Sequence, residues 1–270
     1  MSRTDVAVPL RPRSAAVLVL ASLVGLVMYC WPLLVKVHPD DMVAPPLVFL
    51  LLLPLIIVVV LVEFTEDGMD SKVLALLGVL TAINAVMRGL SAGTSGIELV
   101  FFLMILGGRV FGAGFGFVLG CTSLFASALL TGGVGPWLPF QMMASAWVGM
   151  GAGLLPRRSR GRAEIAMLVA YGIIASYAYG LVTNMMGWPF LLGIEVPGHH
   201  GGLAFVPGDP LGTNLHRFAV YTFLTSTTSI DTGRAIATTL GLLVLGPAVL
   251  TTLRRAARRA RIDRATPLQS

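Results

Sequence analysis

The feature of this chain that most limits its possible folds is a succession of apolar runs, each near the length that crosses a lipid bilayer. A membrane-spanning helix needs about twenty mostly apolar residues. Charged residues make up only 12% of the sequence, about half the share that soluble domains carry. We therefore predict an all-α polytopic integral membrane protein. The eight candidate spans are 14–35, 45–63, 73–90, 96–108, 112–131, 137–155, 163–187 and 232–253.

The basic residues indicate how these spans are oriented. Most of the 19 Lys and Arg residues lie near the N-terminus, around Arg109, at 156–162 and in the C-terminal segment. Because cytoplasmic loops carry an excess of basic residues, we predict that both termini are cytoplasmic, with the long stretch 188–231 outside as a lid. The net charge of +6 then reflects orientation and contact with anionic membrane lipid, and we expect no nucleic-acid partner.

Familiar catalytic motifs are missing from the sequence. It contains no phosphate-binding GxxxxGK[ST] loop, no HExxH, no CxxC and no GxSxG. Glu63 and Glu98 fall at span ends, so no carboxylate is placed for proton relay at the membrane centre. His199 and His200 lack an accompanying cluster of acidic or sulfur ligands, which favours a polar outer turn over a metal site. We therefore expect neither an enzyme nor a bound cofactor or metal.

Small residues recur at helical spacing in three spans. In the third span they lie three and four residues apart, so they share one narrow face of a helix. Such faces let another helix approach closely in a bilayer. That helix can belong to the same chain or to a partner subunit, and the pattern alone allows both. The residues are Gly78, Ala82, Ala85 and Gly89, with Gly116 and Gly120 in the fifth span and Gly149 and Gly153 in the sixth.

Polar and aromatic residues gather at the predicted outer ends of the spans. An Asn and an Arg on one face of the third span are costly toward lipid, so we expect them to face a cavity. Two Trp residues and two further amides flank the outer loops, and with the lid they have the composition of a pocket for a large organic ligand. Alternatively, Trp residues anchor helices at the membrane interface, and the Arg can reach the headgroups. The candidates are Asn84, Arg88, Trp137, Gln141, Asn184 and Trp188.

Residues 73–190 resemble the substrate-binding subunits (S components) of energy-coupling factor (ECF) transporters. The most specific element is G-x-GPW-x-PFQM, from Gly133 to Met142, and the third span GVLTAINAVMRGL is similar to the first core helix of that family. The resemblance implies a six-helix protein that captures a vitamin or metal ion at the outer face of a bacterial cell membrane. It implies as partners a transmembrane scaffold (T) subunit and two ATPase subunits, which agrees with the missing phosphate-binding loop.

The resemblance also implies roles for particular residues. The first core helix of the family presents small residues to the scaffold, which maps a docking surface onto Gly78, Ala82, Ala85 and Gly89. Metal-transporting members begin with a chelating Met-His pair, and this chain begins MSRTD, so we expect a vitamin. Members with a GPW motif resemble predicted cobalamin carriers, which makes cobalamin or a related corrinoid the best candidate.

The chain departs from the family by two additional N-terminal spans, whose role is open, and by Gly in a stripe that is usually built from Ala. We predict three parts: 1–72 with a cytoplasmic tail and these two spans, 73–254 as the six-helix substrate-binding core, and 255–270 as a basic cytoplasmic tail. Two other classes remain for comparison. A self-contained secondary carrier or channel for a small organic solute would have polar residues along several spans. A membrane enzyme would have a catalytic acid, nucleophile or metal site.

Overall fold

The computed structural model of the chain describes residue 8 and residues 10–34, 48–65, 71–91, 97–190 and 202–265. Every regular element in these ranges is helical, which confirms the all-α prediction for this part of the chain. The α-helices are α1 (Pro12–Tyr29), α2 (Trp31–Leu34), α3 (Val48–Thr65), α4 (Ser71–Ser91), α5 (Val100–Phe111), α6 (Ala113–Thr131), α7 (Leu138–Leu154), α8 (Arg162–Gly187), α9 (Leu211–Thr222), α10 (Thr232–Val244) and α11 (Gly246–Ala265). A 3₁₀ turn, η2 (Trp188–Phe190), follows α8, and a π-helix, η3 (Phe223–Asp231), joins α9 to α10.

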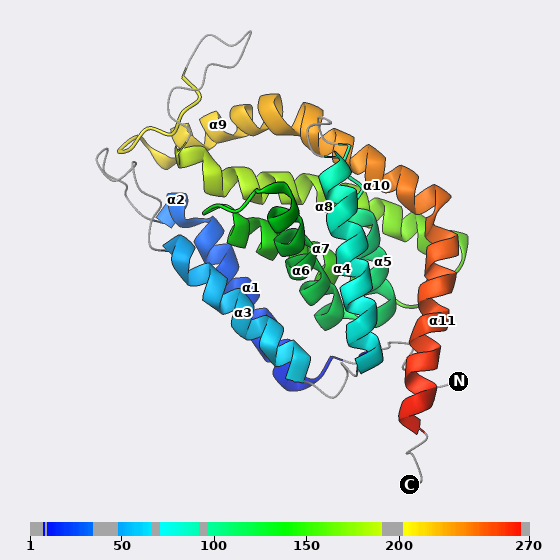
Figure 1. Cartoon of the computed structure of the whole chain (residues 1–270). Coiled ribbons are helices and arrows are strands. Elements are labelled where there is room, and N and C mark those ends of the chain that lie inside the picture. The colour runs from blue at the N-terminus through cyan, green and yellow to red at the C-terminus, as the bar shows by residue number, and fades with distance from the viewer. Residues whose placement is uncertain are drawn as a thin grey trace.

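The apolar runs predict the middle helices well but do not establish how many helices cross the membrane. The boundaries of α5 to α8 fall within four residues of the predicted spans. Among the described residues, four helices are long and apolar enough to cross a membrane, or five if one bent pair is counted as a single span. The prediction of about eight spans is therefore not confirmed. The start of α1 and the end of α11 lie at the same end of the bundle (Figure 1).

The prediction of a loop across 188–231 is wrong for its second half, because helix runs without a break from Leu211 to Val244. The hydroxyl-rich segment FLTSTTSID folds as a π-helix. Its side chains bond back to the carbonyl four residues earlier: Thr225 Oγ1 donates to Tyr221 O (2.7 Å) and Ser229 Oγ to Thr225 O (3.1 Å). Such bonds satisfy hydroxyls inside a helix, so a polar composition does not end this one.

The predicted span 232–253 covers α10 and the start of α11. The helix Leu211–Val244 and the segment Gly246–Arg259 meet there at an angle of 66°. Pro247 follows the break directly; proline lacks a backbone N–H and its ring clashes with the preceding turn, which bends a helix. After the bend, α11 remains helical to Ala265, so the predicted tail 255–270 begins as helix. Figure 1 shows α9–α10 beside α8, with α11 turning away along the bundle.

Helix α5 lies at the centre of the protein, and all twelve of its residues are buried. It passes directly into α6 through Gly112, which has a φ of 113°. Residues with a Cβ rarely adopt this conformation, so glycine lets the chain reverse between two helices with a single connecting residue. The result is a short, enclosed helix whose neighbours are protein on every side.

Helices α6 and α7 pack through glycines on both surfaces. A side chain at Gly116 would overlap the backbone of Gly149, and the reverse is also true. A Cβ on Gly120 would lie 2.6 Å from the Cα of Ala146, and one on Gly153 would lie 2.7 Å from the Cα of Ala113. Of the two explanations for these small residues, the structure supports packing within the chain.

The N-terminal helices α1 and α3 pack against each other and against α7. The indole N–H of Trp147 on α7 donates to Ser22 Oγ on α1 (3.1 Å). Near the end of α1, Tyr29 donates its hydroxyl to the backbone carbonyl of Phe140 and packs edge-on against that ring, with centroids 5.1 Å apart. At the other end, Ser14 donates to Glu63 of α3. The additional pair is therefore an integral part of the bundle.

Candidate functional site

A polar contact joins α4, α6 and α7 at one end of the bundle. Arg88, in the last turn of α4, donates from Nη1 to Ser127 Oγ (3.0 Å) and from Nη2 to Gln141 Oε1 (3.4 Å). The structure thus brings together Arg88 and Gln141, two of the predicted ligand-binding residues. It adds Ser127, which is fully buried and belongs to no motif in the sequence.

An unpaired amide lies one helical turn before Arg88 on α4. The side chain of Asn84 is fully buried, and within the described part of the chain neither its Oδ1 nor its Nδ2 has a hydrogen-bond partner. Among the described residues, the hydroxyl of Ser123 on α6 is buried without a hydrogen-bond partner as well. Native proteins satisfy nearly all buried polar groups. This group of side chains is therefore suited to receive the polar atoms of a ligand.

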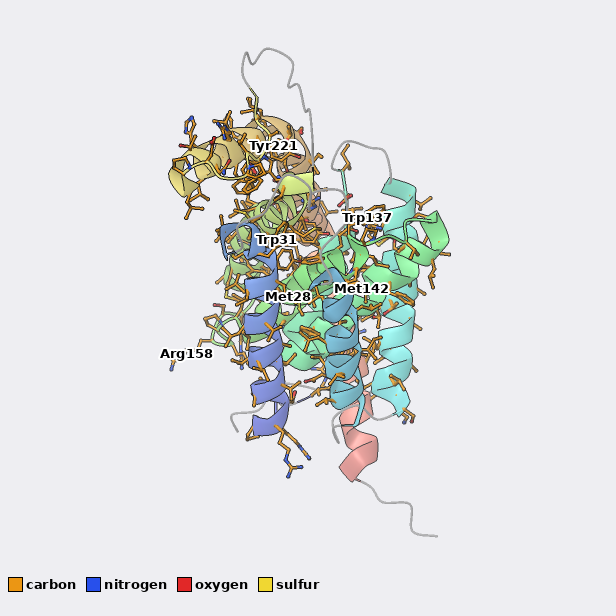
Figure 2. The ribbon with its side chains drawn as sticks, turned by 90° about the vertical axis from the view of Figure 1, so that its left-hand side faces the viewer. Met28, Trp31, Trp137, Met142, Arg158 and Tyr221 are labelled. Atoms are coloured by element: carbon orange, nitrogen blue, oxygen red, sulfur yellow. The ribbon has the colours of Figure 1, made fainter. Side chains whose placement is uncertain are left out.

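The two predicted Trp residues have different environments. Trp137, at the start of α7, is 48% exposed and lies near the upper end of the helices in Figure 2. Trp188 is buried; its Nε1 donates to the carbonyl of Leu203 (2.8 Å), and its ring packs against Phe205 and Phe218. The indole N–H of Trp188 already donates to a backbone carbonyl, so the structure gives this residue a packing role against Phe205 and Phe218.

The remaining candidates on the outer segments can be placed only in part. Asn184, in the last turn of α8, has a buried Nδ2 without a partner, while its backbone carbonyl accepts the N–H of Trp188. Within the described residues, one amide atom of Asn184 thus lacks a partner, compared with both amide atoms of Asn84. His199 and His200 lie outside the described residues.

A buried ion cluster that the sequence reasoning missed lies where α5 begins. Arg234 on α10 pairs with Asp231 (2.8 Å) and with Glu98 (3.2 Å), just before α5. Its guanidinium lies over the rings of Tyr179 and Phe101, at 4.8 and 5.5 Å from their centroids. Cation–π contacts of this kind stabilise a desolvated guanidinium, so α5, α8 and α10 are joined at this point.

Asp231 is the most buried member of this cluster, at 1% exposure. Ser226 Oγ donates to its Oδ2 (2.7 Å), and a side chain at Gly180 would overlap its carboxylate. The spacing of Asp231 and Arg234, three residues apart at the start of an apolar run, is the sequence signal that could have revealed the pair. The predicted span begins at 232, between these two residues, so they were not recognised as a pair.

A second ion cluster lies beyond the opposite end of α7 from Gln141. Glu164, near the start of α8, accepts from Arg109 Nε of α5 (2.7 Å) and from Arg254 Nη2 of α11 (2.6 Å). The basic segments predicted to share one side of the membrane thus meet at one end of the bundle. Which side that end faces remains a prediction.

The small-residue stripe on α4 is divided between two environments. Gly78 and Ala82 are exposed, and a Cβ built on Gly78 would meet nothing within 4 Å. Ala85 is only 1% exposed, and Gly89 is partly covered by Thr131 of α6. Among the described residues, only the first half of the stripe is therefore left open to another helix.

Apolar helices, four or five of which are long enough in the described residues to cross a bilayer, are typical of an integral membrane protein. This chain belongs to the ECF transporter substrate-specific components. Residues 72–257, about two thirds of the chain, match the family described as "ECF transporter, substrate-specific component". Members of this family are transporter subunits and not enzymes. Comparisons with curated proteins and with solved structures gave no match.

Proposed function

We propose that this chain is the substrate-capture subunit of an ECF transporter and binds a vitamin at the outer face of a bacterial membrane. Cobalamin or a related corrinoid is the first candidate, on the resemblance of the GPW segment. The ligand would lie against the ends of α4, α6 and α7. A scaffold subunit and two ATPase subunits would supply the energy for uptake.

The observation that carries this proposal is the buried, unpaired amide of Asn84 next to the Arg88–Gln141 contact. An amide without partners is costly to bury and is retained at a functional site where a ligand supplies the missing bonds. Arg88 lies one turn further along α4 and adds a charge, and its contact with Gln141 of α7 adds a second amide. A ligand rich in amides and carrying a phosphate, as cobalamin does, matches these donors and acceptors.

The direct test is equilibrium binding of a panel of vitamins to the purified full chain. Arg88→Met should weaken binding of the preferred vitamin about tenfold or more, because a charge-assisted hydrogen bond to the ligand is lost. Arg162→Met is the matched control, since Arg162 is exposed at the start of α8. If no vitamin binds, or if both variants bind alike, the ligand site is misplaced.

We further propose that Gly78 and Ala82 dock the scaffold subunit. Small exposed residues let two helices approach closely in lipid, and the open space at Gly78 leaves room for a partner helix. Ala82→Leu should abolish co-purification with scaffold and ATPase subunits while vitamin binding persists. Ala170→Leu, at an exposed position of α8, is the control and should assemble normally.

Transport separates this proposal from a self-contained carrier. Binding alone cannot accumulate a solute, because a site of equal affinity on both sides shifts no population. Vesicles with the chain and its partners should accumulate the vitamin only when ATP is present. Accumulation by the chain alone would show a secondary carrier and overturn the proposal.

A further inference from the structure

A cavity of about 380 Å³ opens at the end of the bundle remote from Arg88. Helix α7 links the two ends, with Gln141 at its start beside Arg88 and the cavity beyond its last residue, Leu154. The walls come from the end of α5, the connection between α7 and α8, and α11. Six of the lining residues are ionisable: Arg109, Arg157, Arg160, Glu164, Arg254 and Arg258.

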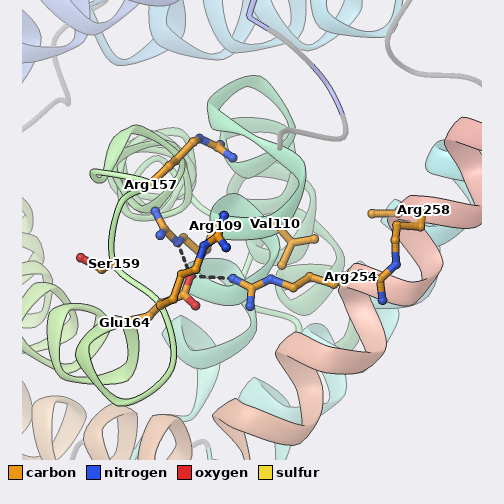
Figure 3. A pocket seen from close by; sticks show the side chains of 9 residues that line it. Arg109, Val110, Arg157, Ser159, Glu164, Arg254 and Arg258 are labelled. Atoms are coloured by element: carbon orange, nitrogen blue, oxygen red, sulfur yellow. Dashed lines mark hydrogen bonds and ion pairs between the residues drawn. The ribbon is translucent and has the colours of Figure 1, made fainter. Parts of the chain in front are cut away.

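The charge of this cavity is strongly unbalanced. Five arginines face one glutamate, which leaves a formal charge of +4 among the lining residues. The single carboxylate is shared, because Arg109 and Arg254 both donate to Oε1 of Glu164. Figure 3 shows these two guanidinium groups directed at Glu164, with Arg157 and Arg258 on either side. Among the residues that line the cavity, the arginines thus outnumber the carboxylate by four.

The back wall of the cavity is held firmly in place. The side chain of Arg109 is only 4% exposed, and its Nη1 also donates to the carbonyls of Leu155 (3.0 Å) and Pro156 (3.1 Å). These bonds anchor the charge within apolar surroundings, where fields are focused and an anion is attracted more strongly than at an open surface. The cavity is therefore a preformed, positively charged recess.

We propose that this cavity binds a phosphate group. Guanidinium groups recognise phosphate oxygens through paired, charge-assisted hydrogen bonds. Basic recesses between membrane helices at the level of the headgroups bind anionic lipid phosphates. The same chemistry would accept inorganic phosphate, so the phosphate group defines the ligand and its source is an experimental question. This site lies at the other end of the protein from the vitamin site and is independent of it.

The test is thermal unfolding of the purified full chain in detergent with defined additions. Short-chain phosphatidylglycerol should raise the unfolding temperature with a saturable dependence, as expected for a ligand of the folded state. Phosphatidylcholine with the same acyl chains is the control for the lipid, and sodium chloride at equal ionic strength is the control for inorganic phosphate. A response to phosphatidylglycerol alone identifies a lipid headgroup, and a response to inorganic phosphate identifies the free anion.

A pair of matched variants locates the site. Arg160→Gln combined with Arg258→Gln removes two lining charges and should raise the half-saturating concentration on the order of tenfold. Arg162→Gln combined with Arg259→Gln removes two exposed charges near these positions but outside the lining. This pair should change the half-saturating concentration by less than about twofold. Equal weakening by both pairs, or no response to either phosphate source, overturns the proposal.

Discussion

Replacing Asn84 by Leu should stabilise this protein and weaken ligand binding at the same time. Leu has a similar shape and size and carries no polar atoms. An unsatisfied buried donor or acceptor costs roughly 1–3 kcal/mol, and two atoms of Asn84 lack partners. Removing them should stabilise the ligand-free chain by about 1–3 kcal/mol. In a protein of this size that corresponds to a rise of about 2–10 °C in unfolding temperature.

Vitamin binding should change in the opposite direction and become weaker in Asn84→Leu. A bound vitamin that pairs with this amide would face an alkyl group in the variant, and its own polar atom would be left buried. The free energy of vitamin binding should become less favourable by about 1.4–3 kcal/mol, which weakens binding roughly 10- to 100-fold. Thermal unfolding in detergent and equilibrium dialysis with the preferred vitamin measure the two effects on one preparation.

A matched control tests whether the predicted stabilisation by Asn84→Leu comes from the missing hydrogen-bond partners. Asn214 is also buried, at 4% exposure, but its side chain bonds both the N–H and the carbonyl of Val206, at 3.1 and 2.9 Å. Asn214→Leu should therefore lower the unfolding temperature. If Asn84→Leu lowers it as well, Asn84 is satisfied in the folded protein, and the reasoning from its unpaired atoms is refuted. Unchanged vitamin affinity would remove Asn84 from the site.

Two further substitutions test the packing and the buried ion cluster. Gly120→Ala should lower stability by about 1–3 kcal/mol, because its Cβ would lie 2.6 Å from a backbone carbon of α7. In the same unfolding assay, Gly78→Ala should be neutral or slightly stabilising, because a Cβ at this position has open space. Asp231→Asn should lower stability by about 1–3 kcal/mol, because Arg234 then keeps only its ion pair with Glu98. Asp209→Asn, at a partly exposed ion pair, is the control. Equal effects of the two substitutions would contradict a special role for the buried cluster.

The helix boundaries that could be predicted are those marked by strong local signals. Apolar runs delimit α5 to α8, with Gly112 and Pro156 at their joints. Helix α9–α10 was not predictable in the same way, because the hydroxyls of Thr225 and Ser229 are satisfied by its own backbone. The bend before Pro247 required knowing that the helix continued on both sides. Composition records polarity but not where each polar group finds its partner.

The candidate site shows the same limit. Arg88 and Gln141 were predicted to gather because both lie near helix ends on one side, and they form a hydrogen bond. Trp188 carries the same sequence signature, yet its N–H is taken by a backbone carbonyl. The cluster around Arg234 depends on residues from three distant segments. Only tertiary structure distinguishes these cases.

The shortness of α5 has an electrical consequence. Its twelve residues make a helix about 18 Å long, with the Arg234 cluster at one end and the Arg109 cluster at the other. The insulating layer between these two charged regions is thus thinner than the roughly 30 Å of a bilayer's hydrocarbon core. Within a bilayer, at least one of the two clusters therefore lies inside the hydrocarbon layer, where protein partners and not water compensate its charges.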